Sequence, residues 1–199
     1  MNSFSFAHPG VDLRAADAEL DWAAGQLRGE GVQHTGKTFA DLRSLFAEGD
    51  RAPLADSTVL YTVSWTGTAA AGSEGSQLFG CTHLQPGTVG DEYFMTHGHF
   101  HADPTRGEMY MTVAGEGILL LMERNGRTRG ERMAPGSLCR IQGTEGHRVV
   151  NTGDAPLIFW ASWPGDAGYD YASIKETGFG LRVFQREGRP ILVPVERPR

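Results

Sequence analysis

The chain has 199 residues, 40% of them hydrophobic, which is enough apolar material for the core of one ordinary domain. Its formal net charge is −6 and it has no run of basic residues, so nucleic acid is not an expected partner. It has no apolar run that could span a bilayer, and its N-terminus lacks a basic region followed by an apolar core. We therefore expect a soluble cytoplasmic protein without a membrane partner.

The first 56 residues differ in sequence pattern from the rest of the chain. They are predicted to form an extension that packs on the main domain or on a partner subunit. Residues 38–48 predict a short amphipathic helix, because Thr38 is a suitable N-cap and Asp41 follows three positions later. A second helix is expected over residues 17–28.

From residue 57 the hydrophobic pattern has a period of two, which is typical of β-strands. The expected strands are 59–65, 78–84, 92–101, 108–113, 118–124, 127–133, 137–142, 156–163, 181–184 and 190–195, with one helical turn within 171–177. Residues 66–77 are Gly-rich and predict a loop, and Asn125-Gly126 predicts a tight hairpin turn. Short strands without a long helix predict an all-β sandwich or barrel over residues 57–199.

Two histidines and a glutamate predict a metal site. His99 and His101 are two residues apart in an expected strand, so their side chains project from one face. The strand from Glu108 is expected to run back beside them and then to pair with strand 118–124. Such a facial set binds divalent first-row metals, and His147, at the start of another expected strand, is the fourth candidate ligand. Affinity order alone does not choose among iron, manganese, nickel, cobalt and zinc.

The motifs around these ligands resemble one protein family. Residues 86–101, 147–153 and 166–171, together with Glu108 and Tyr110, are similar to the cupin-type phosphoglucose isomerases of archaeal type. The resemblance covers about residues 61–178. It includes a six-residue gap between His101 and Glu108, where cupins in general more often have three or four residues.

The resemblance implies a cupin double-stranded β-helix, or jelly-roll barrel, over residues 57–199. The short helical extension expected over residues 1–56 precedes it. It implies a metal-dependent glucose-6-phosphate isomerase that acts on a sugar phosphate, with one divalent metal ion per subunit, Fe²⁺ being the first expectation. It also implies a homodimer. Two alternatives are an iron-dependent cupin dioxygenase and a cupin that binds a sugar phosphate without turnover.

Residue roles follow from the same resemblance. Glu108 would be both a metal ligand and the base that removes the proton alpha to the carbonyl; in the alternative, a metal-promoted hydride shift, it is a ligand only. Tyr110, on the same strand face, would reach toward the substrate, although a core tyrosine is the competing interpretation. The implied substrate-binding residues, most of them phosphate donors, are Thr82, Thr96, Gly98, Tyr171 and, by a looser alignment, Tyr61.

Two positions depart from the family pattern. Trp163 stands where these enzymes usually have a tyrosine, and Tyr169 where the archaeal members have a histidine, so the preferred sugar could differ. His97 is expected just outside the set of metal ligands. Cys81 and Cys139 are expected to be buried and reduced, with a disulfide as the less favoured alternative.

Overall fold

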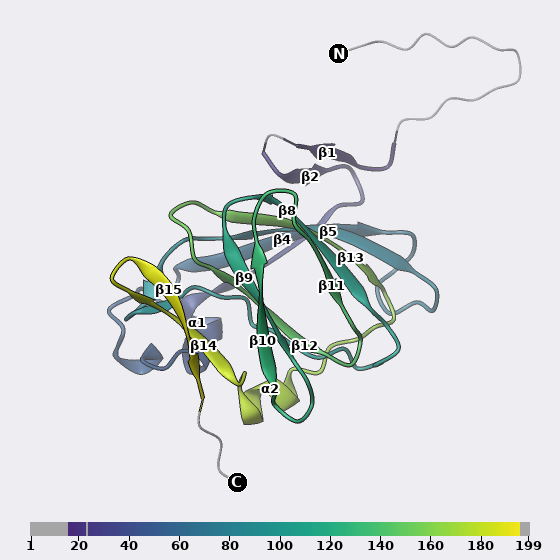
Figure 1. Cartoon of the computed structure of the whole chain (residues 1–199). Coiled ribbons are helices and arrows are strands. Elements are labelled where there is room, and N and C mark those ends of the chain that lie inside the picture. The colour runs from purple at the N-terminus through teal and green to yellow at the C-terminus, as the bar shows by residue number, and fades with distance from the viewer. Residues whose placement is uncertain (1–15, 23, 196–199) are drawn as a thin grey trace, which may run out of the picture.

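Six strands form one antiparallel sheet, which carries much of the candidate site. The computed structural model describes residues 16–22 and 24–195 (Figure 1). In spatial order the strands of this six-stranded sheet are β11 (Leu138–Ile141), β8 (Glu108–Ala114), β13 (Leu157–Pro164), β5 (Gln77–Leu84), β4 (Val59–Gly67) and β3 (Gln33–Thr38). Directly paired residues on neighbouring strands point to the same face, so the register determines which side chains point inward.

Smaller sheets complete the fold. A three-stranded sheet has the order β10 (Thr128–Met133), β9 (Gly117–Met122) and β12 (Gly146–Asn151), and in Figure 1 it lies across the six-stranded sheet. A four-stranded sheet has the order β15 (Arg189–Pro194), β14 (Leu181–Arg186), β7 (Glu92–Tyr93) and β6 (Thr88–Val89). The separate hairpin at the top of Figure 1 is formed by β1 (Glu19–Asp21) and β2 (Gln26–Arg28). The helical elements are α1 (Phe39–Leu42), α2 (Ala172–Thr177) and two 3₁₀ turns, Arg43–Leu45 and Gly49–Arg51.

The main core gathers side chains from the six-stranded and the three-stranded sheet. Leu119 and Leu121 of β9 and Leu60 of β4 are fully buried, and Phe159 of β13 is nearly so. Burying a side chain of this size stabilises the fold by about 1.5–3 kcal/mol. Two antiparallel sheets around one core form the all-β, cupin-type arrangement that the sequence predicted.

The segment that carries His99 is not the long strand predicted over residues 92–101. Only its first two residues form β7, and the later positions Met95, His99 and Phe100 make isolated bridges instead. The bridge from His99 joins it to β12. A glycine with a positive φ angle, Gly98, interrupts the extended backbone immediately before the ligands.

The predicted pairing of the strand from Glu108 is also wrong. β8 pairs with β11 and β13, and neither with the His99 segment nor with β9. The chain leaves β8 through Gly115, whose φ of +79° and close approach to Pro156 O leave no room for a side chain. This turn carries the chain from the six-stranded to the three-stranded sheet, so the two strands face each other across the fold instead of pairing.

Residues 19–21 and 26–28 pair as a hairpin, so the helix predicted over residues 17–28 is wrong. Leu20 and Leu27, seven positions apart, would share a helix face, but they are also direct cross-strand partners in the β1–β2 pair. Trp22 packs on Trp160 of β13, with ring centroids 6.3 Å apart, and the Gly25 carbonyl lies 2.8 Å from Nε2 of His83. The outer face of the six-stranded sheet therefore selects the hairpin.

The predicted helix over residues 38–48 is present but shorter. α1 begins after Thr38, whose N–H and hydroxyl both donate to the Asp41 carboxylate at 2.7 and 2.9 Å, and it ends at Leu42. β3 precedes this helix and joins the six-stranded sheet, so that sheet begins upstream of residue 57. Packing of the extension on a partner subunit stays a prediction, and residues 1–15 lie outside the described part of the chain.

Two other predictions concern the environment of the protein. Cys81 and Cys139 are both buried and free, so the disulfide alternative is not realised. Within the described ranges, no helix is long and apolar enough to cross a membrane.

Candidate metal centre and cavity

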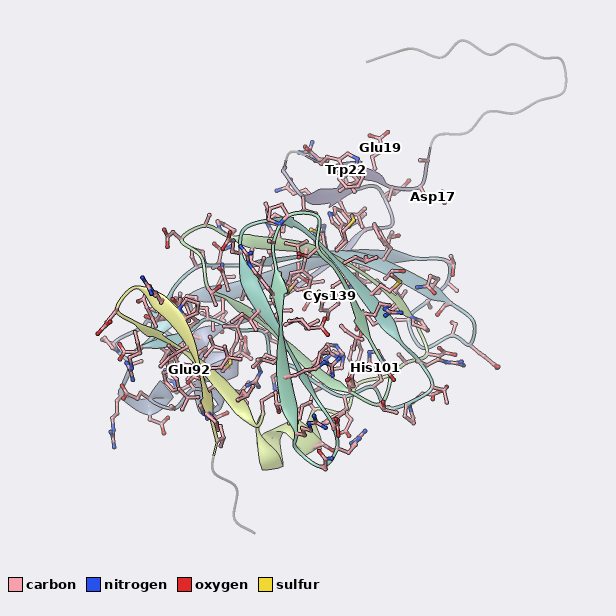
Figure 2. All side chains as sticks on the ribbon, viewed as in Figure 1. Asp17, Glu19, Trp22, Glu92, His101 and Cys139 are labelled. Atoms are coloured by element: carbon pink, nitrogen blue, oxygen red, sulfur yellow. The ribbon has the colours of Figure 1, made fainter. Side chains whose placement is uncertain are left out.

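Four side chains with metal-binding atoms converge inside the fold. His99 and His101 lie between β7 and β8, Glu108 is the first residue of β8, and His147 is the second residue of β12. Their ligating atoms all lie within 4.8 Å of one another. Figure 2 shows His101 inside the fold, away from the outlying hairpin that carries Trp22. These are the four residues that the sequence analysis selected as ligands.

Backbone hydrogen bonds hold two of the ligands side by side. The His99 N–H donates to the His147 carbonyl at 3.2 Å, and the His147 N–H donates to the His99 carbonyl at 3.0 Å. Gly98, with φ of +73°, permits this approach, because a Cβ there would lie 2.9 Å from the His147 carbonyl oxygen. The two imidazole rings consequently lie with their centroids 4.4 Å apart.

Backbone carbonyls orient two of the rings. Nδ1 of His101 lies 2.5 Å from the Arg106 carbonyl, which indicates that Nδ1 carries the proton and that Nε2 is free to bind a cation. Nε2 of the same ring lies 3.2 Å from Oε2 of Glu108. Nδ1 of His147 faces the Glu145 carbonyl at 3.5 Å. Contacts of this kind fix the tautomer and the orientation of metal-binding histidines.

The electrostatics of the cluster suit a cation. Burial alone would raise the pKa of Glu108, but interactions with His101 and His147 lower it to about 2, so the carboxylate is ionised. Burial, and then the charge of His147, lower the pKa of His99 well below its usual value. Burial also acts to lower the pKa of His101, but contacts with Glu108 and Arg106 outweigh it and raise the pKa. An ionised carboxylate beside a neutral imidazole is the form that binds a metal.

Two buried imidazole nitrogens have no hydrogen-bond partner in the described part of the chain: Nε2 of His99 and Nε2 of His147. The second lies 3.2 Å from Oε2 of Glu108, but the angle is unfavourable for a hydrogen bond. An unsatisfied buried polar group costs about 1–3 kcal/mol. With bonds of about 2.1 Å, ligand atoms around one ion stand roughly 3–4.2 Å apart, close to the observed spread. The donor set therefore fits one divalent first-row metal ion.

The ligand cluster opens into a cavity of about 390 Å³, a size within the usual range for small-molecule sites. Three of the four ligands line it, and the fourth, His101, does not. All six residues that the resemblance assigned to the substrate also line this cavity: Tyr61, Thr82, Thr96, Gly98, Tyr110 and Tyr171. The structure thus brings these residues together, while their contacts with a substrate stay predictions.

Several aromatic side chains line the cavity. Tyr169 and Tyr171 are 53% and 43% exposed, and their rings stack with centroids 5.8 Å apart. The Tyr169 ring also contacts the His99 ring at 4.8 Å, and Trp163 lines the same cavity. The His97 ring packs on Tyr171 at 4.6 Å and lies outside the four-residue cluster, as predicted. Both departures from the family pattern, Trp163 and Tyr169, therefore line the cavity.

The sequence analysis missed two cationic residues near this cavity. Lys37 of β3 lines it. Arg148 of β12 is 5% exposed, and its Nη2 and Nε donate to the His97 carbonyl at 2.7 and 3.2 Å. Burial lowers the pKa of Arg148 to about 10. Arg148 directly follows the predicted ligand His147, and this neighbouring position could have marked it as a residue near the site. Lys37 could be found only by recognising that β3 pairs with β4.

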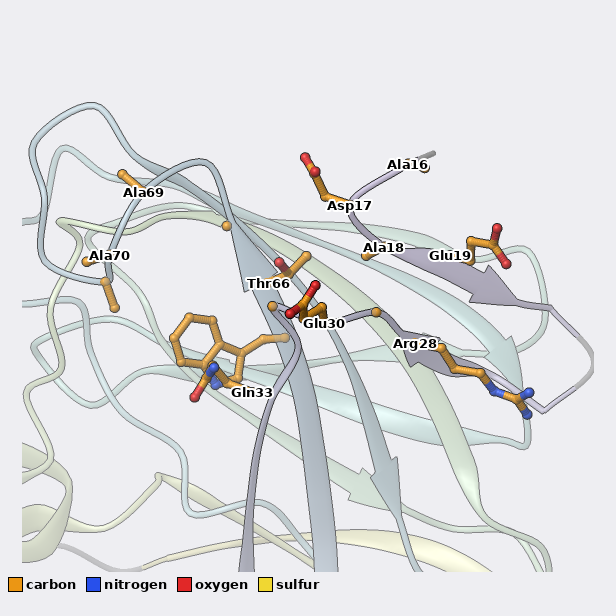
Figure 3. Close-up of a pocket in the computed structure, with 15 residues that line it drawn as sticks. Ala16, Asp17, Ala18, Glu19, Arg28, Glu30, Gln33, Thr66, Ala69 and Ala70 are labelled. Atoms are coloured by element: carbon orange, nitrogen blue, oxygen red, sulfur yellow. The ribbon is translucent and has the colours of Figure 1, made fainter. Parts of the chain in front are cut away.

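A second hollow lies between the β1–β2 hairpin and the Gly-rich loop after β4 (Figure 3). Its volume is about 980 Å³, and it shares Trp65 and Ala71 with the ligand-lined cavity. Many of its lining residues are alanine and glycine, and none of the four ligand residues is among them. Size alone does not make a site, so the smaller cavity is the candidate.

Comparisons with known proteins find one matching family model and relatives with related names. The model of the family described as "Glucose-6-phosphate isomerase (GPI)" matches residues 36–192. The glucose-6-phosphate isomerase of Thermococcus kodakarensis is 44% identical over 126 residues, 63% of this chain and 66% of that protein. The putative glucose-6-phosphate isomerase 2 of Rhizobium meliloti is 39% identical over 179 residues, 88% of this chain and 84% of that protein.

The matches to the archaeal relatives are partial. Those to the Thermococcus kodakarensis, Thermococcus litoralis and Thermococcus onnurineus proteins span 66%, 63% and 61% of their lengths, slightly less than two thirds. Among solved structures, the oxalate decarboxylase of Lactobacillus farciminis is 22% identical with a TM-score of 0.43. That similarity covers 56% of this chain and 30% of the other.

Proposed function

The chain belongs to the glucose-6-phosphate isomerase family, and on that premise we propose that it interconverts glucose 6-phosphate and fructose 6-phosphate in a metal-dependent reaction. One observation carries the proposal. Three of four converging metal-binding side chains line a cavity of about 390 Å³ whose remaining wall is rich in hydroxyl groups. An aldose–ketose isomerase needs both features, because it must stabilise negative charge on oxygen and hold a phosphorylated sugar.

The proposed cofactor is one divalent ion per subunit, Fe²⁺ by preference, held by His99, His101, Glu108 and His147. When bound, it would polarise the substrate carbonyl and stabilise developing negative charge. Glu108 is buried, and the Arg106 carbonyl and Glu108 orient the His101 ring, so these donor atoms already face one another. Mn²⁺, Ni²⁺, Co²⁺ and Zn²⁺ suit the same donors.

Glu108 is the proposed catalytic base. It is the only carboxylate among the described residues that line the cavity, and Tyr110, two positions along β8, shares its inward face. Its low pKa makes it a weak base, which leaves the hydride-shift route as the alternative. Turnover in D₂O separates the two, since proton transfer through Glu108 introduces deuterium into the product and a hydride shift does not.

The proposed substrate contacts lie on the other walls. The hydroxyls of Thr82, Thr96, Tyr61 and Tyr171 and the backbone at Gly98 are suited to hold the phosphate and sugar oxygens. The Thr96 hydroxyl already accepts a hydrogen bond of 3.0 Å from the Val149 N–H, which fixes its position.

A coupled assay for glucose 6-phosphate formed from fructose 6-phosphate tests the proposal. Wild-type protein should be active, chelator-treated protein inactive, and activity should return on reloading with single divalent metals. Undiminished activity after complete metal removal, verified by elemental analysis, would contradict it. Oxygen uptake with a catechol or thiol substrate would instead support the dioxygenase alternative, and ligand-induced stabilisation without product would support a binding protein.

A homodimer and a cytoplasmic location complete the proposal. The outer face of the six-stranded sheet supports the dimer, because Leu138, Met109 and Phe79 are 61%, 43% and 38% exposed there. The strand register places the three side chains on the face opposite Glu108. Exposed apolar side chains gathered on one sheet face are typical of protein–protein contacts.

A further inference from the structure

Lys37 lies on the cavity side of the edge strand β3. It is the direct partner of Tyr61 on β4, and two positions earlier Thr35 pairs with Val63, which pairs in turn with Thr82 on β5. Since directly paired residues share a face, Lys37 points to the same side as Tyr61 and Thr82. The lining of the cavity agrees, because it includes all three of these residues.

The ammonium group of Lys37 has no assigned role in the fold. It is half-buried, and within the part of the chain that the structure describes it has no hydrogen bond or ion pair. Many of the arginines, in contrast, contact carboxylates, as Arg106 does with Asp166 at 2.9 Å. Lys37 is also one of only two lysines in the chain. Asp41, beyond ion-pair distance, is the carboxylate that senses its charge. A partly desolvated cation at a cavity wall that makes no ion pair within the described residues is suited to a ligand anion.

The surroundings of Lys37 are those of an anion site. Thr96, His97 and Gly98 line the same cavity, and Arg148 places a buried guanidinium on the His97 carbonyl behind that segment. The Arg148 side chain also packs over the Phe179 ring, 4.5 Å from its centroid, which holds its charge in place. A chain with a formal net charge of −6 needs such local positive charge to attract a phosphate dianion.

We propose that Lys37 binds the phosphate group of the substrate, as a direct cationic donor supplied by the edge strand β3. The proposal rests on the proposed isomerase function for the identity of the sugar. The recognition of a phosphate monoester by Lys37 does not depend on the isomerase function. The ammonium group supplies positive charge, while the hydroxyls and the Gly98 backbone donate hydrogen bonds that orient the phosphate.

The test compares Lys37→Met, which keeps the length of the side chain but removes its charge, with Lys37→Arg and with Lys175→Met. Lys175 is the other lysine and is exposed on α2, so it is a matched control. Loss of a hydrogen bond from a charged group should raise the KM for fructose 6-phosphate roughly ten- to a hundredfold in K37M. Because this contact is the same in the ground and transition states, kcat should change little.

Inhibition by inorganic phosphate provides a second readout. Its inhibition constant should rise by a similar factor in K37M, recover in K37R and stay unchanged in K175M. Metal content and thermal unfolding midpoints should be equal in all variants. A K37M enzyme with wild-type KM and wild-type phosphate inhibition would overturn the proposal, as would a loss confined to kcat. Should K37M fail to fold, Lys37→Gln serves as the neutral variant.

Failure of this proposal can be told apart from failure of the isomerase function. If the wild-type protein does not isomerise fructose 6-phosphate, the function fails, and Lys37 is then judged on binding alone. In that case inorganic phosphate, titrated by calorimetry, should still bind the wild type more tightly than K37M. Equal affinities would overturn the role of Lys37 whatever reaction the protein catalyses.

Discussion

At the scale of single residues, hydrogen bonds and steric contacts position the donor atoms. His101 is held from both sides, by the Arg106 carbonyl at Nδ1 and by Glu108 at Nε2. The sequence identified all four candidate ligands because residue type and spacing are enough to recognise such a set. It could not identify Lys37, since a lone lysine has no motif and its role depends on a strand register that only the fold supplies.

Replacing Glu108 with Gln should separate charge from shape. The amide has nearly the same volume, but it removes the negative charge that the cluster of imidazoles stabilises. We expect divalent metal affinity to fall at least tenfold and isomerase activity to fall further. Calorimetric metal titration measures the first effect. The control Glu116→Gln, at an exposed acid between β8 and β9, should match the wild type. Equal metal affinity in both variants would show that Glu108 is not a ligand.

Gly98→Ala should damage both stability and the metal site. The new Cβ would stand 2.9 Å from the His147 carbonyl oxygen and 2.9 Å from the Phe179 ring, at a φ of +73°. We expect a loss of about 1–3 kcal/mol in the free energy of unfolding. Urea unfolding measures it. Gly31→Ala is the control, since it meets one atom at 4.0 Å without a positive φ. An unchanged unfolding midpoint for Gly98→Ala would contradict the described geometry.

At the scale of elements, the sequence predicted most strands from β4 onward but not all of their partners. Alternation of apolar and polar residues shows that a segment is a strand. Which strands pair with each other depends on turns such as the one at Gly115, after which β9 joins a different sheet from β8. Residues 17–28 were predicted as a helix because Leu20 and Leu27 would share one face of a helix. The same two residues are also cross-strand partners in a hairpin. Burial of Leu27 against the six-stranded sheet favours the hairpin over the helix. A local sequence pattern does not show this long-range contact.

Asp170 makes the stability of α2 depend on pH. Its carboxylate accepts hydrogen bonds from the hydroxyl and N–H of Ser173 at 2.7 and 3.1 Å and from Arg124 at 2.9 Å, which lower its pKa to about 2. A carboxylate whose pKa is depressed by folding contributes stability above its unfolded value near 4. That contribution is lost as the pH falls toward 2.

The thermal unfolding midpoints of wild type and Asp170→Ala, measured from pH 6 to pH 2, check this dependence. The wild type should have the higher midpoint at pH 6, and the gap should close through the range from about 4 to 2. Asp154→Ala, at an exposed loop acid, should show no such gap. A gap that is constant over the whole pH range would mean that the charge of Asp170 is not responsible.

At the scale of the whole molecule, the inner face of the six-stranded sheet carries the cavity and its outer face carries exposed apolar side chains. The sequence predicted the all-β class and the ligand set, because both depend on period and spacing. It placed residues 1–56 outside the main domain, because their composition differs from that of residues 57–199. Strand β3 nevertheless completes the sheet, and only long-range pairing with β4 shows this.

Leu138→Glu tests the proposed dimer. This side chain is 61% exposed on the outer face, so a charge there should have little effect on folding but should oppose contact between two apolar faces. Size-exclusion chromatography with light scattering should give the mass of two chains for the wild type and of one for the variant. Arg127→Glu, in the exposed turn before β10, should remain dimeric. A wild-type mass equal to one chain would rule the dimer out.

The reciprocal backbone bridge between His99 and His147 has a consequence for how the protein acquires its ion. Peptide hydrogen bonds join the two segments that carry these donors, and these bonds do not themselves require a cation. The polypeptide should mature first and be metallated afterwards, and one ion should be exchangeable for another without refolding. The element recovered with the protein would then report the supply in its growth medium.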